Sequence, residues 1–150
     1  MQLLDALRAK FGPADGFTVL DYLYTYGSPV ECLMYLELLW PRFEEIDGMV
    51  LLSELSSGDI DRDALTRVMQ TEGGDRAAVE RRFNHVEFLY IFGNPDPTGE
   101  LDDDGYEDFG RVLCEVWKAR LMTQFPGRYF VVELDLDDEC IEMYEDRTSP

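Results

Sequence analysis

The sequence predicts a single α+β domain over residues 1–150, with about five strands in an antiparallel or mixed sheet and helices mainly on one face. Three observations carry this prediction. Capping residues precede several stretches that have the apolar spacing of helices. Two pairs of strand-like segments are separated by turn residues. Helices and strands follow one another without strict alternation, which is typical of the α+β class. The length of 150 residues and the 45% of hydrophobic residues match one domain with a sizeable core.

The first forty residues predict helices. Apolar residues recur at helical spacing over Leu3–Phe11, and Gly12-Pro13 ends that short helix. A second helix is expected over Thr18–Tyr26. A third begins at Ser28-Pro29-Val30-Glu31, a capping box with proline at the first helical position. It is expected to cover Pro29–Leu39.

A hairpin and two capped helices follow. Phe43–Ile46 and Met49–Leu52 flank Asp47-Gly48, which suits a two-residue type I′ turn because glycine tolerates positive φ. Asp61 is the expected N-cap of one helix, and Asp75 is that of a second helix.

The last third combines the longest helix with a second hairpin. His85–Phe92 is rich in aromatic and β-branched residues on both alternating faces, which predicts a buried central strand. Gly93–Gly105 is the main loop. A wide apolar stripe over Phe109–Leu121 predicts the longest helix. The chain closes with a hairpin of Tyr129–Leu136 and Cys140–Glu145.

The charge of the chain bears on its partners. There are 32 acidic against 13 basic residues, a formal net charge of −19, and residues 94–150 hold 16 acids and 5 bases. Such a charge disfavours contact with nucleic acid or with an anionic membrane surface. Neither an apolar run of roughly 20 residues nor a secretory signal is found, so we expect a cytoplasmic protein without a membrane span.

Residues for nucleophilic catalysis are scarce. The only histidine, His85, stands at the start of an expected buried strand, where a structural role is the common one. Cys32, Cys114 and Cys140 are odd in number and far apart, so they fit neither a disulfide framework nor the spacing of a zinc site. We interpret all three as packing residues. The sequence thus predicts no catalytic residue and no cofactor.

A calcium site is the strongest of the metal candidates, and the sequence argues against it. Asn94–Leu101 resembles the first two-thirds of an EF-hand loop, but Gly105 occupies the place of the bidentate glutamate. We therefore expect no metal site.

Apolar alternation sets the expected register of the final hairpin. With Asp137 and Asp138 as turn residues, Leu134 faces Ile141 on the core side. The same register pairs Val132 with Met143 on that side.

This register also gathers acids on the outer face. Glu133 lies directly opposite Glu142, with Asp135 beside them, and like charges in such positions destabilise a sheet. One interpretation is protection of an exposed sheet edge. The other is a surface for a cationic partner, formed by Glu133, Asp135, Asp137, Asp138 and Glu142.

The helix Pro29–Leu39 has two interpretations. Its only charges, Glu31 and Glu37, lie about 120° apart, and the arc between them includes Met34 and Leu38. The helix is either fully buried, with charges reaching out at its edges, or it exposes Met34 and Leu38 as an apolar patch for a protein contact.

The leading functional interpretation is a non-catalytic binding protein that meets a basic protein surface. In size, charge and lack of a catalytic signature, the chain resembles the small acidic proteins that neutralise bacterial toxins. The resemblance is one of type, and it implies an inhibitor or immunity protein. The alternatives are a small carboxylate-dependent hydrolase and a structural subunit that forms a homodimer through Pro29–Leu39.

Overall fold

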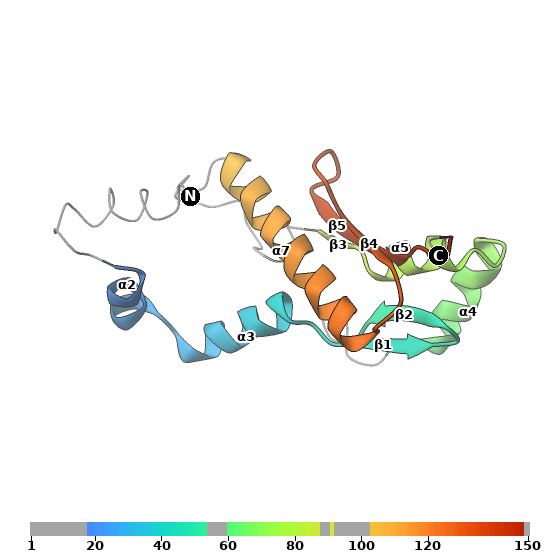
Figure 1. Cartoon of the computed structure of the whole chain (residues 1–150), viewed down its shortest axis with the longest axis horizontal. Coiled ribbons are helices and arrows are strands. Elements are labelled where there is room, and N and C mark those ends of the chain that lie inside the picture. Colours follow the sequence, from blue (N-terminus) through green and yellow to red (C-terminus); the bar gives the residue numbers. More distant parts are fainter. Residues whose placement is uncertain (1–17, 54–59, 88–90, 92–102, 149–150) are drawn as a thin grey trace.

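The computed structural model describes residues 18–53, 60–87, 91 and 103–148, and it confirms a mixed α+β fold (Figure 1). The helices are α2 (Val19–Tyr26), α3 (Pro29–Leu39), α4 (Arg62–Thr71), α5 (Arg76–Phe83) and α7 (Asp103–Gln124). The strands are β1 (Phe43–Ile46), β2 (Met49–Leu52), β3 (Val86–Glu87), β4 (Phe130–Asp135) and β5 (Cys140–Glu145). The predicted five-stranded sheet is wrong for this part of the chain. The described strands form two antiparallel sheets, β1-β2 and β3-β5-β4.

The predicted helix starts and the turn of the first hairpin are confirmed, except that only one half of the capping box at Ser28 forms. The Ser28 hydroxyl accepts a hydrogen bond from the backbone N–H of Glu31. Asp61 and Asp75 each accept from two backbone N–H groups of the first turn that follows them. In the first hairpin, Asp47 and Gly48 both have positive φ, as a type I′ turn requires.

Helix α7 packs across both sheets and forms the main core. Trp117, Leu113 and Leu121 are fully buried on its inner face. They pack against inward residues of both hairpins: Phe43, Val50, Leu52, Val132, Ile141 and Met143. Helices α4 and α5 cover the other face of β1-β2, so all four residues of β2 are buried. None of the described helices is both long enough and apolar enough to cross a membrane.

Two buried polar side chains of α5 and its C-cap connect the sheets. The first, Asn84, accepts from the backbone N–H of Leu52 at 2.7 Å. Its amide nitrogen donates to the carbonyls of Val50 and Met143, at 2.9 and 3.1 Å. Asn84 thereby satisfies backbone groups of β2 and β5 that would otherwise need a neighbouring strand.

Glu80, one helical turn earlier, does the same with its carboxylate. Its two oxygens accept from the backbone N–H groups of Val50 and Glu145, each at 2.8 Å. Arg147 pairs with this fully buried carboxylate at 2.8 Å, which supplies the cation that a buried charge needs. The two sheets therefore meet through side chains rather than through a shared backbone ladder.

The predicted central strand His85–Phe92 is wrong in its position in the sheet. Within the described residues, strand β3 is Val86–Glu87 and lies at the edge of its sheet, whereas β5 is central. Ile91 is helical. The predicted helix Leu3–Phe11 and the calcium-like part of the main loop lie outside the described residues.

Candidate functional site on the closing hairpin

The register predicted for the final hairpin is confirmed. Val132 pairs with Met143 and Leu134 with Ile141. Three of these four side chains are buried, and Leu134 is partly buried. The period of two along each strand therefore forces the alternate residues onto the outer face.

The turn is longer than predicted. The strands end at Asp135 and Cys140, so the loop has four residues, Leu136–Glu139. The carboxylate of Asp135 accepts from the backbone N–H groups of Asp137 and Asp138, at 2.9 and 3.1 Å. Asp135 thus caps its own turn and holds two further acids at the tip of the hairpin.

Acidic residues occupy the outer face in rows across three strands. Glu133 on β4 lies opposite Glu142 on β5, as predicted. Across the other edge of β5, Cys140 pairs with Glu87 of β3. Because Cys140 also pairs with Asp135, the carboxylates of Asp135 and Glu87 flank Cys140 from the two neighbouring strands.

Charge is divided along the length of this hairpin. At its open end, Arg128 donates two hydrogen bonds to the carboxylate of Glu145, at 2.8 and 2.6 Å. These bonds hold the pKa of Glu145 below its usual value. Arg147 pairs with the same carboxylate at 2.8 Å. The acid of the open end, Glu145, is therefore neutralised by two arginines.

The tip is different. Among the described residues, no lysine or arginine pairs with Glu133, Asp135, Asp137 or Asp138. A surface hollow of about 450 Å³ lies here, lined by four acids and two leucines: Glu133, Leu134, Asp135, Leu136, Asp137 and Glu142. The five acids predicted as a partner surface therefore lie together on one end of one hairpin. We call Glu133, Asp135, Asp137, Asp138 and Glu142 the acidic tip.

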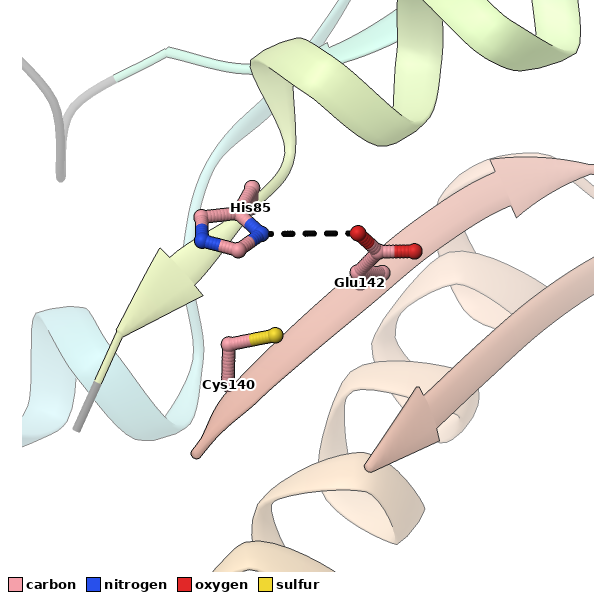
Figure 2. Close-up of side chains that lie close together, drawn as sticks. All are labelled: His85, Cys140 and Glu142. Atoms are coloured by element: carbon pink, nitrogen blue, oxygen red, sulfur yellow. Dashed lines mark hydrogen bonds and ion pairs between the residues drawn. The ribbon is translucent and has the colours of Figure 1, made fainter. Parts of the chain in front are cut away.

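One histidine lies beside the acidic tip (Figure 2). The Nδ1 of His85 is 3.4 Å from a carboxylate oxygen of Glu142, and its Nε2 is 3.4 Å from one of Glu87. About a third of the His85 side chain is exposed, so the predicted place at the start of a buried strand is wrong. The Sγ of Cys140 lies within 4.8 Å of a ring nitrogen of His85 and of a carboxylate oxygen of Glu142.

The two buried thiols are unsuited to nucleophilic attack. Burial, followed by the nearby carboxylates of Glu142, Asp135, Asp138 and Glu87, raises the pKa of Cys140 to about 11. Burial also raises the pKa of Cys114. Both therefore stay protonated at neutral pH, and the thiolate is the nucleophile. Cys140 and Cys114 are buried as predicted, whereas Cys32 is exposed, which corrects its assignment to packing.

Of the two residues predicted as an apolar patch on α3, Met34 is exposed and Leu38 is not. Leu38 is only 5% exposed and belongs to the core, because the C-terminal end of α3 packs on α7. Its carbonyl accepts from the indole N–H of Trp117 at 2.8 Å. Met34 is 67% exposed.

The rest of α2 and α3 forms an apolar arm. Both helices project from the body of the molecule (Figure 1). Eleven large hydrophobic residues of this arm are exposed: Val19, Leu20, Leu23, Tyr24, Tyr26, Val30, Leu33, Met34, Tyr35, Leu36 and Trp40. The expectation of a fully buried helix is therefore wrong for α3.

No protein-family model, curated protein or solved structure matches this chain. Function is therefore argued from the geometry of the chain itself. That geometry groups the acidic tip with His85, Glu87 and Cys140, which the sequence analysis left out of the site. The pairing of Val86 with Ile141 brings these three residues beside the acidic tip, and it can be predicted only when the strand order is known.

Proposed function

We propose that this protein is a non-catalytic binding protein that recognises a basic protein surface through its acidic tip. The observation that carries the proposal is the division of charge along one hairpin. The acid of the open end, Glu145, pairs with Arg128 and Arg147, whereas no lysine or arginine pairs with the acidic tip among the described residues. A chain that places arginines on one end of a hairpin leaves the other end free to meet cations of another molecule.

The energetics favour an external cation. Glu133 and Glu142 face each other across the strands, and like charges in directly opposite positions are destabilising. A lysine or arginine of a partner would relieve this repulsion on binding. The concentrated field would also speed encounter with a basic protein, since steering acts on the association rate. In the inhibitor version of this proposal, the acids block a basic substrate-binding surface such as that of a nuclease.

Edge protection is the competing explanation. Strand β4 is the outer strand in the order β3-β5-β4, and charged residues on an edge strand hinder pairing with other chains. Edge protection needs charge of either sign on the edge strand, whereas binding a basic partner needs negative charge at these positions. Charge reversal at matched positions separates the two.

The test compares two doubly charge-reversed variants. The first, Glu133→Lys with Asp138→Lys, changes the acidic tip and leaves His85, Cys140 and Glu142 intact. The second, Asp108→Lys with Glu115→Lys, makes the same change in net charge at two exposed positions of α7. Each protein is immobilised, and bound proteins from the source organism's lysate are quantified at low salt. We expect a basic protein that binds the wild type and the α7 variant but is lost from the tip variant. Equal capture by both variants would reject the acidic tip as the binding surface.

A second candidate function follows from the apolar arm. Exposed apolar surface of this extent marks protein contacts. The arm from 18 to 40 holds three charged residues, all acidic. Because the exposed side chains of the arm are mainly apolar, we propose a second copy of the chain as its occupant, packed arm against arm as a structural homodimer.

Sedimentation equilibrium tests this second candidate. Met34→Glu should convert a dimer to a monomer. Met122→Glu is the matched control, because Met122 on α7 is 69% exposed and Met34 67%. A wild-type protein that is monomeric at about 100 µM, far above the range of stable dimers, would reject the homodimer.

A further inference from the structure

Three side chains of different chemistry converge on the outer face of the three-stranded sheet (Figure 2). One ligand atom from each of His85, Cys140 and Glu142 lies within 4.8 Å of the other two. The arrangement follows from the sheet register. Pairing of Val86 with Ile141 places His85 opposite Glu142, and Cys140 lies two residues before Glu142 on the same face.

The set of donor atoms suits zinc. Imidazole nitrogen, thiolate sulfur and carboxylate oxygen are the three ligand types that bind Zn²⁺ in proteins, whereas Ca²⁺ and Mg²⁺ take oxygen. Tetrahedral ligands at bond lengths of about 2.0–2.3 Å lie roughly 3.3–3.8 Å apart. The contact of His85 Nδ1 with Glu142 Oε1 is 3.4 Å, already within that range. Only the distances from the Cys140 sulfur to the other two ligand atoms, up to 4.8 Å, need to shorten when a metal binds.

A supporting carboxylate is in place on the histidine. Metal-binding histidines commonly donate their other ring N–H to a carboxylate, which fixes the ring and strengthens the ligand. Here the Nε2 of His85 is 3.4 Å from Glu87, on the side away from Glu142. Glu87 is therefore placed to orient the imidazole if Nδ1 binds a metal.

The environment also attracts a cation and admits it. Cys140 is flanked across the sheet by Glu87 and Asp135. The side chains of His85 and Glu142 are 32% and 30% exposed, so an ion has access from the solvent.

We propose that His85, Cys140 and Glu142 form a zinc site, with a water molecule in the fourth position and Glu87 as the residue that orients the imidazole. Zinc binds the thiolate, so the proton of Cys140 passes to solvent when the Zn–S bond forms. This proposal replaces the expectation that the chain has no metal site. That expectation used the spacing of the cysteines along the chain, and two of the three ligands proposed here are not cysteines.

Zinc titration of the full-length chain tests the proposal directly. The reduced protein is first freed of metal by a chelator, and Zn²⁺ is then added in competition with a chromogenic zinc chelator. We expect one ion per chain with a dissociation constant of micromolar or lower. His85→Gln and Cys140→Ser should each weaken binding by more than tenfold, and Glu87→Gln by about tenfold, as loss of an outer partner does.

Matched variants control for unspecific binding. Cys32→Ser removes the exposed thiol, and Glu115→Gln removes an exposed carboxylate of α7 that is not a proposed ligand. Both should leave the affinity within about twofold, well under the loss expected for a ligand-supporting residue. With Co²⁺ in place of zinc, a thiolate charge-transfer band should appear in Cys32→Ser and be absent in Cys140→Ser.

Binding of less than one ion per chain, or an affinity unchanged by His85→Gln, would overturn the proposal. His85 is partly exposed at a sheet edge, so this variant decides the matter even where replacement of the buried Cys140 prevents folding. The titration uses the metal alone and no partner. A failed titration would therefore not count against the proposed protein partner. Failure to find that partner would likewise not count against the zinc site.

Discussion

Replacement of Asn84 by alanine should cost the protein a large part of its stability. Asn84 is fully buried, and its side chain makes hydrogen bonds with the backbone of Leu52, Val50 and Met143. Alanine would leave three buried backbone groups without partners. Each unsatisfied group costs about 1–3 kcal/mol, so the free energy of unfolding should fall by at least about 3 kcal/mol. Native proteins are stable by only about 5–15 kcal/mol, which makes this a severe loss.

Urea unfolding followed by circular dichroism measures this loss. With a denaturant slope of about 2 kcal/mol per molar urea, the midpoint should fall by about 1.5 M. Gln70→Ala is the control, because Gln70 is exposed on α4, and its effect should stay within about 0.5 kcal/mol. Asn84→Asp retains the acceptor for the N–H of Leu52 and loses both donated bonds, so it should also be destabilised. If Asn84→Ala were as stable as the control, the idea that side chains connect the two sheets would be refuted.

Three further predictions concern stability. First, the pKa of Glu145 is lowered in the folded protein, so its contribution is present above the unfolded value of about 4.5 and is lost as pH falls through the folded pKa. Glu145→Gln should therefore flatten the loss of unfolding free energy between pH 7 and pH 3, and an unchanged slope would contradict this. Second, Leu38→Ala should cost about 2–4 kcal/mol in urea unfolding and Met34→Ala under about 0.5 kcal/mol, since only Leu38 is in the core. Similar losses of unfolding free energy for the two variants would refute the packing of only the C-terminal end of α3 on the core. Third, salt at about 0.3 M should raise the thermal midpoint by screening repulsion within a chain of net charge −19. A midpoint that falls steadily with salt would mean that attractive pairs dominate.

Local chemistry made several elements predictable. The Asp47-Gly48 turn needs two positive φ angles, and few residue pairs supply them. The register of β4 with β5 follows from the period of two, because a slip of one residue would turn Val132 and Met143 toward solvent. These features depend on neighbours in sequence or on one face of one hairpin.

The number of sheets depended on contacts that no local pattern encodes. Glu80 and Asn84 stand four residues apart, so they lie on one side of α5, and each bonds to two strands that are distant in sequence. A glutamate within a short charged helix is ordinarily solvent-exposed. Its burial follows only when β2, β5 and Arg147 are brought together.

The sequence predicted the acidic residues of the candidate site but not its histidine and cysteine. Hairpin register alone places Glu133 opposite Glu142. The neighbourhood of His85 and Cys140 requires the order β3-β5-β4, and the sequence analysis expected a central strand at His85–Phe92 instead. The exposure of Met34 likewise depends on which part of α3 reaches α7.

The most direct measurement of the central claim is the rate at which the acidic tip captures its basic partner as salt is varied. Association is followed by stopped-flow fluorescence for the wild type, for Glu133→Lys with Asp138→Lys, and for Asp108→Lys with Glu115→Lys. We expect the tip variant to associate at least tenfold more slowly than the wild type at low salt. The difference should narrow at high salt, because steering is screened. The α7 variant, with the same net charge as the tip variant, should stay much closer to the wild type. Equal rates for the two variants at every salt concentration would contradict the account, since total charge and not the acidic tip would then set the encounter.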